Sequence, residues 1–154
     1  MDLEAFSKNY LVRGLTPEQI AEMAKTATMR RYVAQEYLMR TGEAGADVFV
    51  ILKGRVNVLT QDGDKLAEVG PGTVLGEIAL IDARPRSACA NCIGMVDVAI
   101  FEAKTLRSWM NQNRELGFTV LVNLAQVLCG RLRDADSKID ALTQQTTDGW
   151  TNAL

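Results

Sequence analysis

Hydrophobic and polar positions follow three different patterns along the chain, and the first is helical. Apolar residues recur at helical spacing within the first 36 residues, namely Leu15, Ile20, Met23 and Ala24. Thr16, Pro17 and Glu18 form a helix N-terminus signal, because a threonine side chain can cap free amide groups and proline fits the first helical position. We therefore expect N-terminal helices over residues 1–36.

The second pattern, over residues 37–101, is that of short strands. The apolar runs VFVIL, RVNVLT, KLAEV and VDVAIF are separated by glycines and turn pairs. Asp62-Gly63 predicts a tight hairpin, since a type I′ turn needs positive φ at both central residues. Many short strands at this spacing are typical of a sandwich, a jelly roll or a barrel.

The third pattern is helical again, over residues 103–142. It predicts a short helix from Ala103 to Gln112 and a longer one that Asn113 caps. A narrow apolar seam follows the longer helix at steps of three or four: Leu121, Leu124, Leu128, Leu132, Ala135, Ile139 and Leu142. The last residues, 143–154, carry turn formers and little periodicity, so we expect a flexible tail there.

The seam has two interpretations. It could pack onto the protein's own strands, or it could join two copies of the chain. We expect a homodimer through residues 113–142, because the seam continues far past the length that one small domain could cover. The residues predicted to form the contact are Leu124, Leu128, Leu132 and Ala135.

Composition narrows the class of protein. The 154 residues are 47% hydrophobic and 23% charged, which is the composition of a single globular domain, here residues 1–142. No apolar run approaches the ~20 residues of a spanning helix, and the N-terminus lacks a signal peptide's pattern, so we expect a cytoplasmic protein with no membrane partner. A net charge of −2 gives no general attraction to nucleic acid.

Cysteine and histidine usage argues against metal and redox chemistry. The chain has three cysteines and no histidine, so Cys89 and Cys92 lack the further ligands of a structural zinc site. Their CxxC spacing lies in a strand-like stretch rather than at a helix N-terminus, and we interpret both as small core side chains. No nucleophile–base pair or metal constellation is present in the sequence, so we do not expect an enzyme.

The stretch GEIALIDARPRSA, residues 76–88, carries isolated charges beside apolar residues. Burying an unpaired ion is costly, so Glu77 and Arg86 need partners. One interpretation is structural: Glu77 suits a helix N-terminus without any ligand, and Arg86 could pair with it or with Asp82. The other is that both residues hold a ligand.

The order of elements and three motifs together resemble the cyclic nucleotide-binding domain family, most closely its catabolite activator type. The motifs are GEAGADVFVILKGRVNV (residues 42–58), VGPGTVLGEIAL (69–80) and RPRSA (84–88). The last two are similar to the family's phosphate-binding cassette, and the resemblance covers nearly all of the chain from Leu11 onward. It implies a mostly β fold, an eight-stranded β-roll (a double-stranded jelly roll) with N-terminal helices and a long C-terminal helix.

The resemblance also implies a role for each cassette residue. Arg86 and Ser87 would hold the cyclic phosphate with the amides of a short helix around Ile78 and Ala79, and Glu77 would accept the ribose 2′-hydroxyl. Gly76 would let the backbone come close to the ligand. The other residues predicted to contact the ligand are Val58, Leu66, Val74, Leu75, Ala88, Ala135 and Asp136.

Two of these residues bear on the base. In the family, a threonine at the position of Ala88 favours guanine, so alanine there favours cAMP. Asp136 could accept from the adenine amino group, but also from two guanine donors at once, which keeps cGMP open. We expect cAMP as the ligand, with cGMP as the alternative, and no cofactor.

The resemblance departs from the family's pattern in two respects. Leu75 replaces the aromatic residue that the family often has before the Gly-Glu pair, which we interpret as a change in packing. The chain ends at Leu154 without a helix-turn-helix or a basic stripe, so we expect a stand-alone sensor with no direct DNA binding. It would signal to an unknown downstream protein partner by repositioning its C-terminal helix. The alternatives are an interaction and dimerisation module with a degenerate pocket, and a haem sensor that would need Cys or Met ligands.

Overall fold

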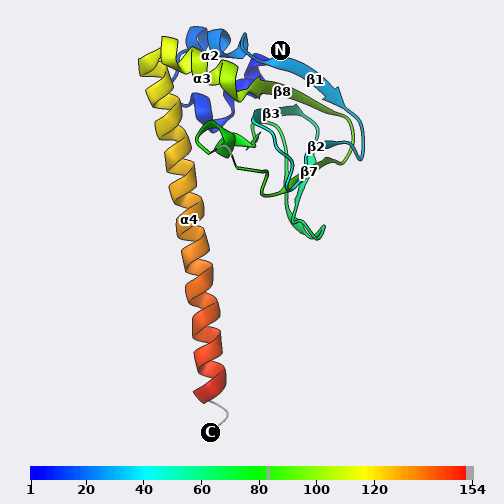
Figure 1. The fold of residues 1–154 in the computed structure, drawn as a ribbon, viewed down its shortest axis with the longest axis vertical. Coiled ribbons are helices and arrows are strands. Elements are labelled where there is room, and N and C mark those ends of the chain that lie inside the picture. The colour runs from blue at the N-terminus through cyan, green and yellow to red at the C-terminus, as the bar shows by residue number, and fades with distance from the viewer. Residues whose placement is uncertain (83, 152–154) are drawn as a thin grey trace.

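The computed structural model describes residues 1–82 and 84–151, and within them the chain forms two four-stranded antiparallel sheets that close into a roll (Figure 1). The sheet orders are β1-β8-β3-β6 and β2-β7-β4-β5. The predicted eight-stranded β-roll is confirmed. The strands are β1 (Thr28–Tyr32), β2 (Tyr37–Met39), β3 (Asp47–Lys53), β4 (Val56–Leu59), β5 (Lys65–Val69), β6 (Val74–Leu75), β7 (Cys89–Cys92) and β8 (Val96–Glu102).

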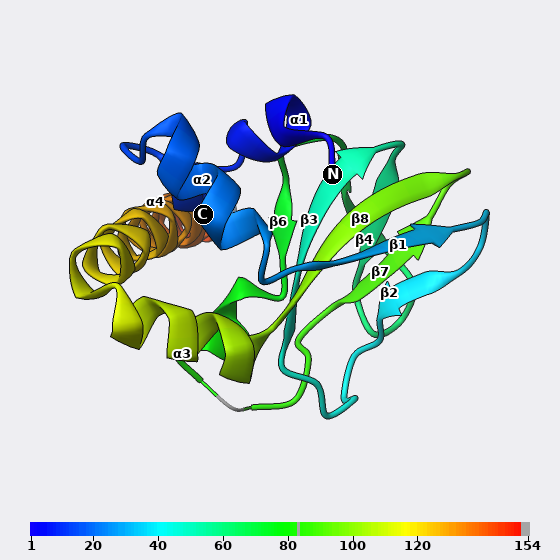
Figure 2. The same ribbon diagram turned by 90° about the horizontal axis from the view of Figure 1, so that it is seen from above.

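Helices gather on one side of this roll (Figure 2). They are α1 (Leu3–Ser7), the 3₁₀ helix η1 (Tyr10–Val12), α2 (Pro17–Ala24), the 3₁₀ helix η2 (Glu77–Leu80), α3 (Ala103–Gln112) and α4 (Arg114–Thr151). The predicted start of α2 is confirmed: the Thr16 hydroxyl accepts from the Gln19 amide, and the Gln19 side chain accepts from the Thr16 amide.

Strand β3 explains how the roll and the helices share one core. It lies between β8 and β6, and its side chains are buried on both faces. Phe49 and Ile51 point into the roll, where they meet residues of the second sheet such as Val56 and Ala90. Val48 and Val50 belong instead to a cluster under the helices. Its continuous apolar run therefore reflects two covered faces.

Strand β1 falls within the predicted helical zone, so the boundary of that zone at residue 36 was wrong. Helix α2 ends at Ala24 and β1 follows from Thr28. Only Tyr32 of this strand is buried, and the remaining residues are exposed, so no apolar alternation marks the strand in the sequence. Backbone pairing with β8, from Thr28 opposite Ile100 to Tyr32 opposite Val96, defines β1 instead.

The hairpin between β4 and β5 forms where Asp62-Gly63 predicts it, but not as a type I′ turn. Gly63 has φ 91°, whereas Asp62 does not have a positive φ. The Thr60 amide donates to the carbonyl of Asp64 (2.8 Å), and the Asp64 amide donates to the Thr60 hydroxyl (3.0 Å). The longer loop that results needs a positive φ only at its glycine.

Helix α4 is longer than predicted. It runs to Thr151, whereas the sequence analysis expects the helix to end at residue 142 and a flexible tail to follow. Residues 152–154 lie outside the described part of the chain. Over residues Arg114–Gln144 the helix meets the length and composition of a membrane-spanning segment, and 22% of its most apolar stretch is buried. This observation concerns length and composition only. It differs from our expectation that no apolar stretch of the chain approaches the length of a spanning helix.

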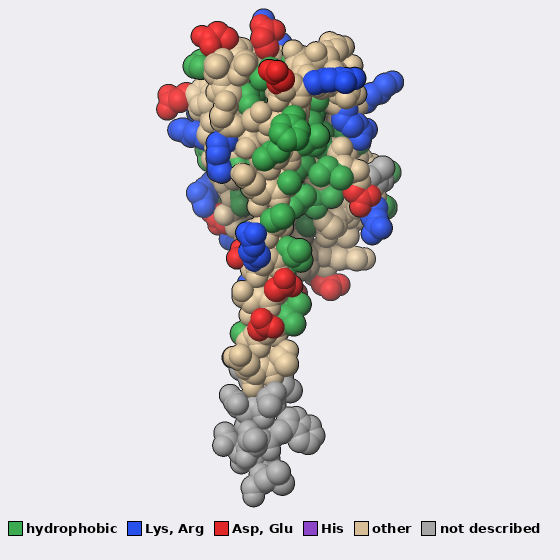
Figure 3. Space-filling view, turned by 90° about the vertical axis from the view of Figure 1, so that its left-hand side faces the viewer, with side chains coloured by type: hydrophobic (Ala, Val, Ile, Leu, Met, Phe, Trp, Pro, Cys, Tyr) green, Lys and Arg blue, Asp and Glu red, His purple; other side chains and the backbone are tan. Residues whose placement is uncertain are grey.

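The first turns of α4 pack onto the protein itself. The Asn123 side-chain amide donates to the carbonyls of Leu11 (3.0 Å) and Arg13 (2.8 Å), which fixes α4 against η1. Leu124 is fully buried in the core, and Leu128 is partly buried against it. The placement of Leu124 on a dimer seam was therefore wrong. Hydrophobic side chains remain visible on the outer face of the molecule in Figure 3.

Candidate functional site

A cavity of about 450 Å³ opens beside η2, between the strands of the second sheet and α4. Its wall comes from β4, β5 and β6, from η2 with the following loop at residues 84–88, and from one side chain of α4, Arg131. The cavity is therefore bounded by the segment that the sequence singles out and by the helix predicted to move.

Gly76 immediately precedes η2 and allows the tightest approach in the site. Its φ of 74° lies in the left-handed region. A Cβ at this position would lie 2.5 Å from Nη1 of Arg86 and 2.7 Å from the carbonyl oxygen of Asp47. Conformation and space therefore both require glycine here.

Arg86 is a nearly buried cation, with 9% of its surface exposed. Its Nη2 donates to the carbonyl of Asp47 (2.7 Å) and its Nη1 to the carbonyl of Gly76 (3.3 Å). Among the described residues it forms no salt bridge with a carboxylate. Burial lowers the pKa of its guanidinium, while the negative charges of Asp47, Glu43 and Glu77 oppose that effect.

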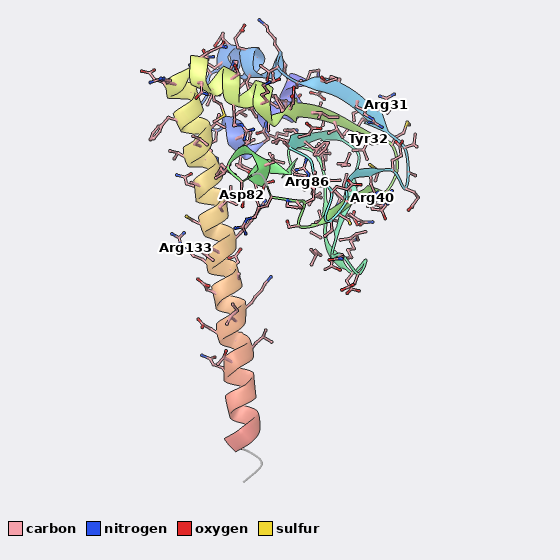
Figure 4. All side chains as sticks on the ribbon, viewed as in Figure 1. Arg31, Tyr32, Arg40, Asp82, Arg86 and Arg133 are labelled. Atoms are coloured by element: carbon pink, nitrogen blue, oxygen red, sulfur yellow. The ribbon has the colours of Figure 1, made fainter. Side chains whose placement is uncertain are left out.

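The backbone around Arg86 is fixed by the glycine-rich loop before β3. The Arg86 amide donates to the carbonyl of Glu43 (3.1 Å), and the Gly42 amide donates to the carbonyl of Arg86 (2.9 Å). Figure 4 shows Arg86 at the junction between η2 and the roll. The guanidinium is thus held in place from both its backbone and its side-chain ends before any ligand binds.

Glu77 is the second buried charge, with 3% of its surface exposed. Nη1 of Arg131 donates to its Oε1, while the Arg131 side chain stays 53% exposed. Sequence reasoning missed Arg131. Its position one helical turn before Ala135, on the helix predicted to cover the ligand, was the available signal.

The structural interpretation of Arg86 can now be assessed. Arg86 pairs neither with Glu77, which Arg131 contacts, nor with Asp82, which forms an ion pair with Arg84 (3.2 Å). That interpretation was wrong about the partners. In the described part of the chain the guanidinium of Arg86 donates to two carbonyl oxygens and lies over the ring of Phe49, 5.7 Å from its centroid.

Most of the predicted contact residues line the cavity: Val58, Val74, Leu75, Gly76, Glu77, Ile78, Ala79, Arg86, Ser87 and Ala88. The Ala79 amide, predicted to face the ligand, donates to the carbonyl of Gly76 (3.1 Å). Sequence reasoning missed other lining residues besides Arg131, namely Met39, Ala67, Val69, Thr73, Asp82, Arg84 and Pro85.

Three predicted residues lie elsewhere. Leu66 is 61% exposed and does not line the cavity; its neighbour Ala67 does, because alternate residues of a strand face opposite sides. Ala135 and Asp136 lie on the exposed part of α4 beyond Arg131 and do not line the cavity. In this arrangement of α4, both residues lie outside the wall of the cavity.

The cysteines are free thiols, and Cys89 and Cys92 lie in β7 as predicted. Cys92 belongs to the core of the roll, and burial raises the pKa of its thiol. Within residues 1–82 and 84–151, no cluster of three or more histidine, cysteine or carboxylate residues could hold a metal ion.

Comparisons with known proteins identify relatives of this fold and site. Residues 29–113 match the family model of the cyclic nucleotide-binding domain. The chain is 26% identical over 140 residues to the CRP-like cAMP-activated global transcriptional regulator of Mycobacterium tuberculosis, covering 88% of this chain and 61% of the regulator. It is 30% identical over 135 residues to glutaminase 1 of Bradyrhizobium diazoefficiens, covering 86% of this chain but only 22% of that protein.

A solved structure has a similar fold. The catabolite activator protein of Thermus thermophilus superposes with a TM-score of 0.78 at 27% identity, covering 88% of this chain and 63% of the other. This chain therefore spans only part of the length of the two curated relatives named above, 61% of the regulator and 22% of the glutaminase. The roll, the cavity beside η2 and the match over residues 29–113 lead to one conclusion: the chain belongs to the cyclic nucleotide-binding domain family.

Proposed function

We propose that this protein is a cAMP sensor that binds its ligand in the cavity beside η2. The observation that carries the proposal is Arg86, a nearly buried guanidinium that lines the cavity without a carboxylate partner among the described residues. A buried cation of this kind is favourable when an anion binds, and its planar fork suits two phosphate oxygens. The exposed Ser87 hydroxyl lies next to it on the cavity wall.

The rest of the cavity suits a nucleoside. Its volume of about 450 Å³ lies within the range of small-molecule sites. Apolar side chains of the strands, such as Val58, Val69 and Leu75, offer a surface for a base. Glu77 lies on the same wall, where its carboxylate can accept from the ribose 2′-hydroxyl, as the family resemblance implies.

The signal passes to α4 through Arg131. This residue lines the cavity and contacts Glu77, so a ligand that binds Glu77 and carries a negative phosphate competes for both members of the pair. Release of Arg131 frees the exposed part of α4 to change position, which offers a second surface to a downstream protein partner.

The base preference rests on Ala88, which lines the cavity, whereas Asp136 does not. This arrangement supports cAMP over cGMP. The curated relatives include both kinds of protein, since the M. tuberculosis regulator is described as cAMP-activated and egl-4 of Caenorhabditis elegans (29% identical over 153 residues) as a cGMP-dependent kinase.

A homodimer through α4 completes the proposal, with a revised seam. Leu124 is buried in the protein's own core, so we leave it out of the seam and assign Ala125 to the seam instead. The apolar spacing along the helix then becomes regular, with alternating steps of four and three residues. The revised seam is Leu121, Ala125, Leu128, Leu132, Ala135, Ile139 and Leu142. Leu132 and Ile139 are 63% and 60% exposed in the single chain. This exposure supports the proposal that a second copy of the chain packs against them.

Two measurements test the ligand. Mass spectrometry of the denatured protein identifies any nucleotide that copurifies, and calorimetric titration of the nucleotide-free protein with cAMP, cGMP and 5′-AMP measures the affinity for each. We expect saturable binding of cAMP and much weaker binding of 5′-AMP, whose phosphate carries more charge and is not cyclic. Failure of both cyclic nucleotides to bind would favour the alternative function, a dimerisation module with an unused cavity.

A further inference from the structure

Three turns form the end of the roll that lies opposite α4. They join β1 to β2 (residues 33–36), β3 to β4 (54–55) and β7 to β8 (93–95). Figure 4 shows Arg31 and Tyr32, which precede the first turn, at the end of the roll farthest from α4. We call residues 30–36, 53–55 and 93–97 the end surface. None of them lines the ligand cavity, so nucleotide binding does not account for their features.

Backbone hydrogen bonds hold the three turns together. The Gln35 amide donates to the carbonyl of Cys92 (2.8 Å), and the Ile93 amide donates to the carbonyl of Arg55 (3.0 Å). Gln35 has a φ of 70°, in the left-handed region that residues other than glycine rarely adopt, so its contacts hold the first turn in a strained conformation. The three turns therefore form one continuous surface of defined shape.

Three apolar side chains are exposed on the end surface: Val33 (55%), Ile93 (42%) and Met95 (66%). Tyr32 pairs with Val96 at the end of the β1–β8 ladder, so the next residues, Val33 and Met95, leave the ladder side by side. Ile93 lies in the same turn as Met95. Exposed apolar side chains that are grouped in this way mark a binding surface, whereas isolated ones do not.

The end surface carries an excess of positive charge, although the whole chain has a net charge of −2. It holds four cations and two carboxylates, namely Arg30, Arg31, Lys53, Arg55, Glu36 and Asp97. Arg31 pairs with Asp97 (2.6 Å), and Arg55 pairs with Glu68, which lies outside the surface (2.5 Å). The other two cations, Arg30 and Lys53, form no salt bridge within the described part of the chain. Both can therefore attract an external anion.

We propose that the end surface docks onto an anionic lipid surface, with Val33, Ile93 and Met95 entering the boundary between headgroups and acyl chains and with Arg30 and Lys53 close to the headgroup phosphates. The proposal goes beyond the proposed function and does not depend on it. Side chains at the tips of turns can enter a lipid layer without a groove to receive them, and cations behind them are attracted by anionic headgroups.

This contact is peripheral. It requires neither a spanning helix nor a signal peptide, the two features on which the expectation of no membrane partner rests. Because α4 lies on the opposite side of the roll (Figure 4), the ligand cavity beside it would stay open to solution while the end surface is on the lipid.

The test measures the partition of the protein onto unilamellar vesicles by cosedimentation. The vesicles are neutral phosphatidylcholine alone, or phosphatidylcholine mixed with anionic phosphatidylglycerol. We expect wild type to bind the anionic vesicles, more weakly as the salt concentration rises. Ile93→Ser combined with Met95→Ser should lower the partition coefficient about tenfold, because less apolar surface is buried. Lys53→Glu should lower it by about the same factor.

The control is Ile81→Ser, which removes an apolar side chain of similar exposure (59%) outside the end surface and should bind as wild type does. Circular dichroism shows whether each variant is folded. A gain-of-function variant, Met95→Trp, should bind more tightly, because tryptophan favours the membrane–water interface, and the fluorescence of the added indole should shift to the blue on binding.

Failure of wild type to bind anionic vesicles would overturn the proposal and favour an acidic protein as the occupant of the end surface. Undiminished binding by the folded Ile93→Ser and Met95→Ser double variant would overturn it as well, because the contact would then lie elsewhere on the molecule. Neither outcome bears on the nucleotide, whose binding the calorimetric titration tests separately.

Discussion

Arg131 on α4 donates a hydrogen bond to the buried carboxylate of Glu77 on η2, across 54 residues of sequence. The contact joins the wall of the ligand cavity to the long helix. Glu77 is almost fully buried, whereas Arg131 is half exposed. If the pair separates, Arg131 can return to water at little cost, because its side chain already reaches the solvent. The buried carboxylate of Glu77 then needs a new donor. The contact is therefore suited to respond to a ligand.

The first prediction concerns this pair. Arg131→Ala leaves a buried carboxylate without its donor, so we expect the unliganded protein to lose about 1–3 kcal/mol in free energy of unfolding, measured by urea denaturation. Arg133→Ala is the matched control, because Arg133 lies on the side of α4 that faces away from the roll (Figure 4). Equal stability of the two variants would show that the contact contributes nothing.

Much of the fold could be predicted because its cues are local. Glycine-punctuated strands, the Thr16 cap and the helix at residues 103–112 each follow from a few neighbouring residues. Strand β1 could not be predicted, since four of its five residues are exposed and only pairing with β8 defines it. Leu124 was misplaced for a similar reason: its cover is the cluster under the helices, which a helical spacing rule does not reveal.

The site could be predicted only in part for the same physical reason. Gly76, Glu77 and Arg86 lie in one short segment, so their proximity was visible in the sequence. Arg131 comes to Glu77 from a distant part of the sequence, and only the packing of α4 beside the roll brings it there.

The second prediction concerns the close approach at Gly76. In Gly76→Ala, the left-handed conformation alone should cost about 1–2 kcal/mol in unfolding free energy, and the added Cβ would displace the Arg86 guanidinium, which lies 2.5 Å from its position. We expect both stability and cAMP affinity to fall. The control is Gly94→Ala, where a Cβ would meet nothing within 4 Å. If Gly76→Ala binds cAMP as well as wild type does, Arg86 is not held as described.

The third prediction concerns assembly through the revised seam. Leu132→Glu combined with Ile139→Glu should yield a monomer by multi-angle light scattering, with the roll still folded by circular dichroism, because both side chains are exposed in the single chain. Leu128 is unsuitable as a test position, since it also packs on the protein's own core.

The control for assembly is Gln126→Glu combined with Ser137→Glu, which adds the same charge on α4 outside the seam. This variant should remain a dimer. A wild-type protein that is monomeric at high concentration would contradict the seam outright.

The fourth prediction concerns the base. Because Ala88 lines the cavity and Asp136 does not, cAMP should bind more tightly than cGMP in a calorimetric competition. Asp136→Ala should leave that preference in place. Tighter binding of cGMP by tenfold or more, about 1.4 kcal/mol, that collapses in Asp136→Ala would show that α4 carries the specificity.

The most direct test of the central claim is the cAMP affinity of Arg86→Ala beside that of wild type, measured by isothermal titration calorimetry. Truncation leaves the phosphate without its buried cation, so we predict a loss of about 2–4 kcal/mol in binding free energy, with a smaller loss for Glu77→Ala. Arg40→Ala, an exposed arginine outside the cavity wall, should bind as wild type does. Unchanged affinity in a folded Arg86→Ala protein would contradict the assignment of this cavity as the nucleotide site.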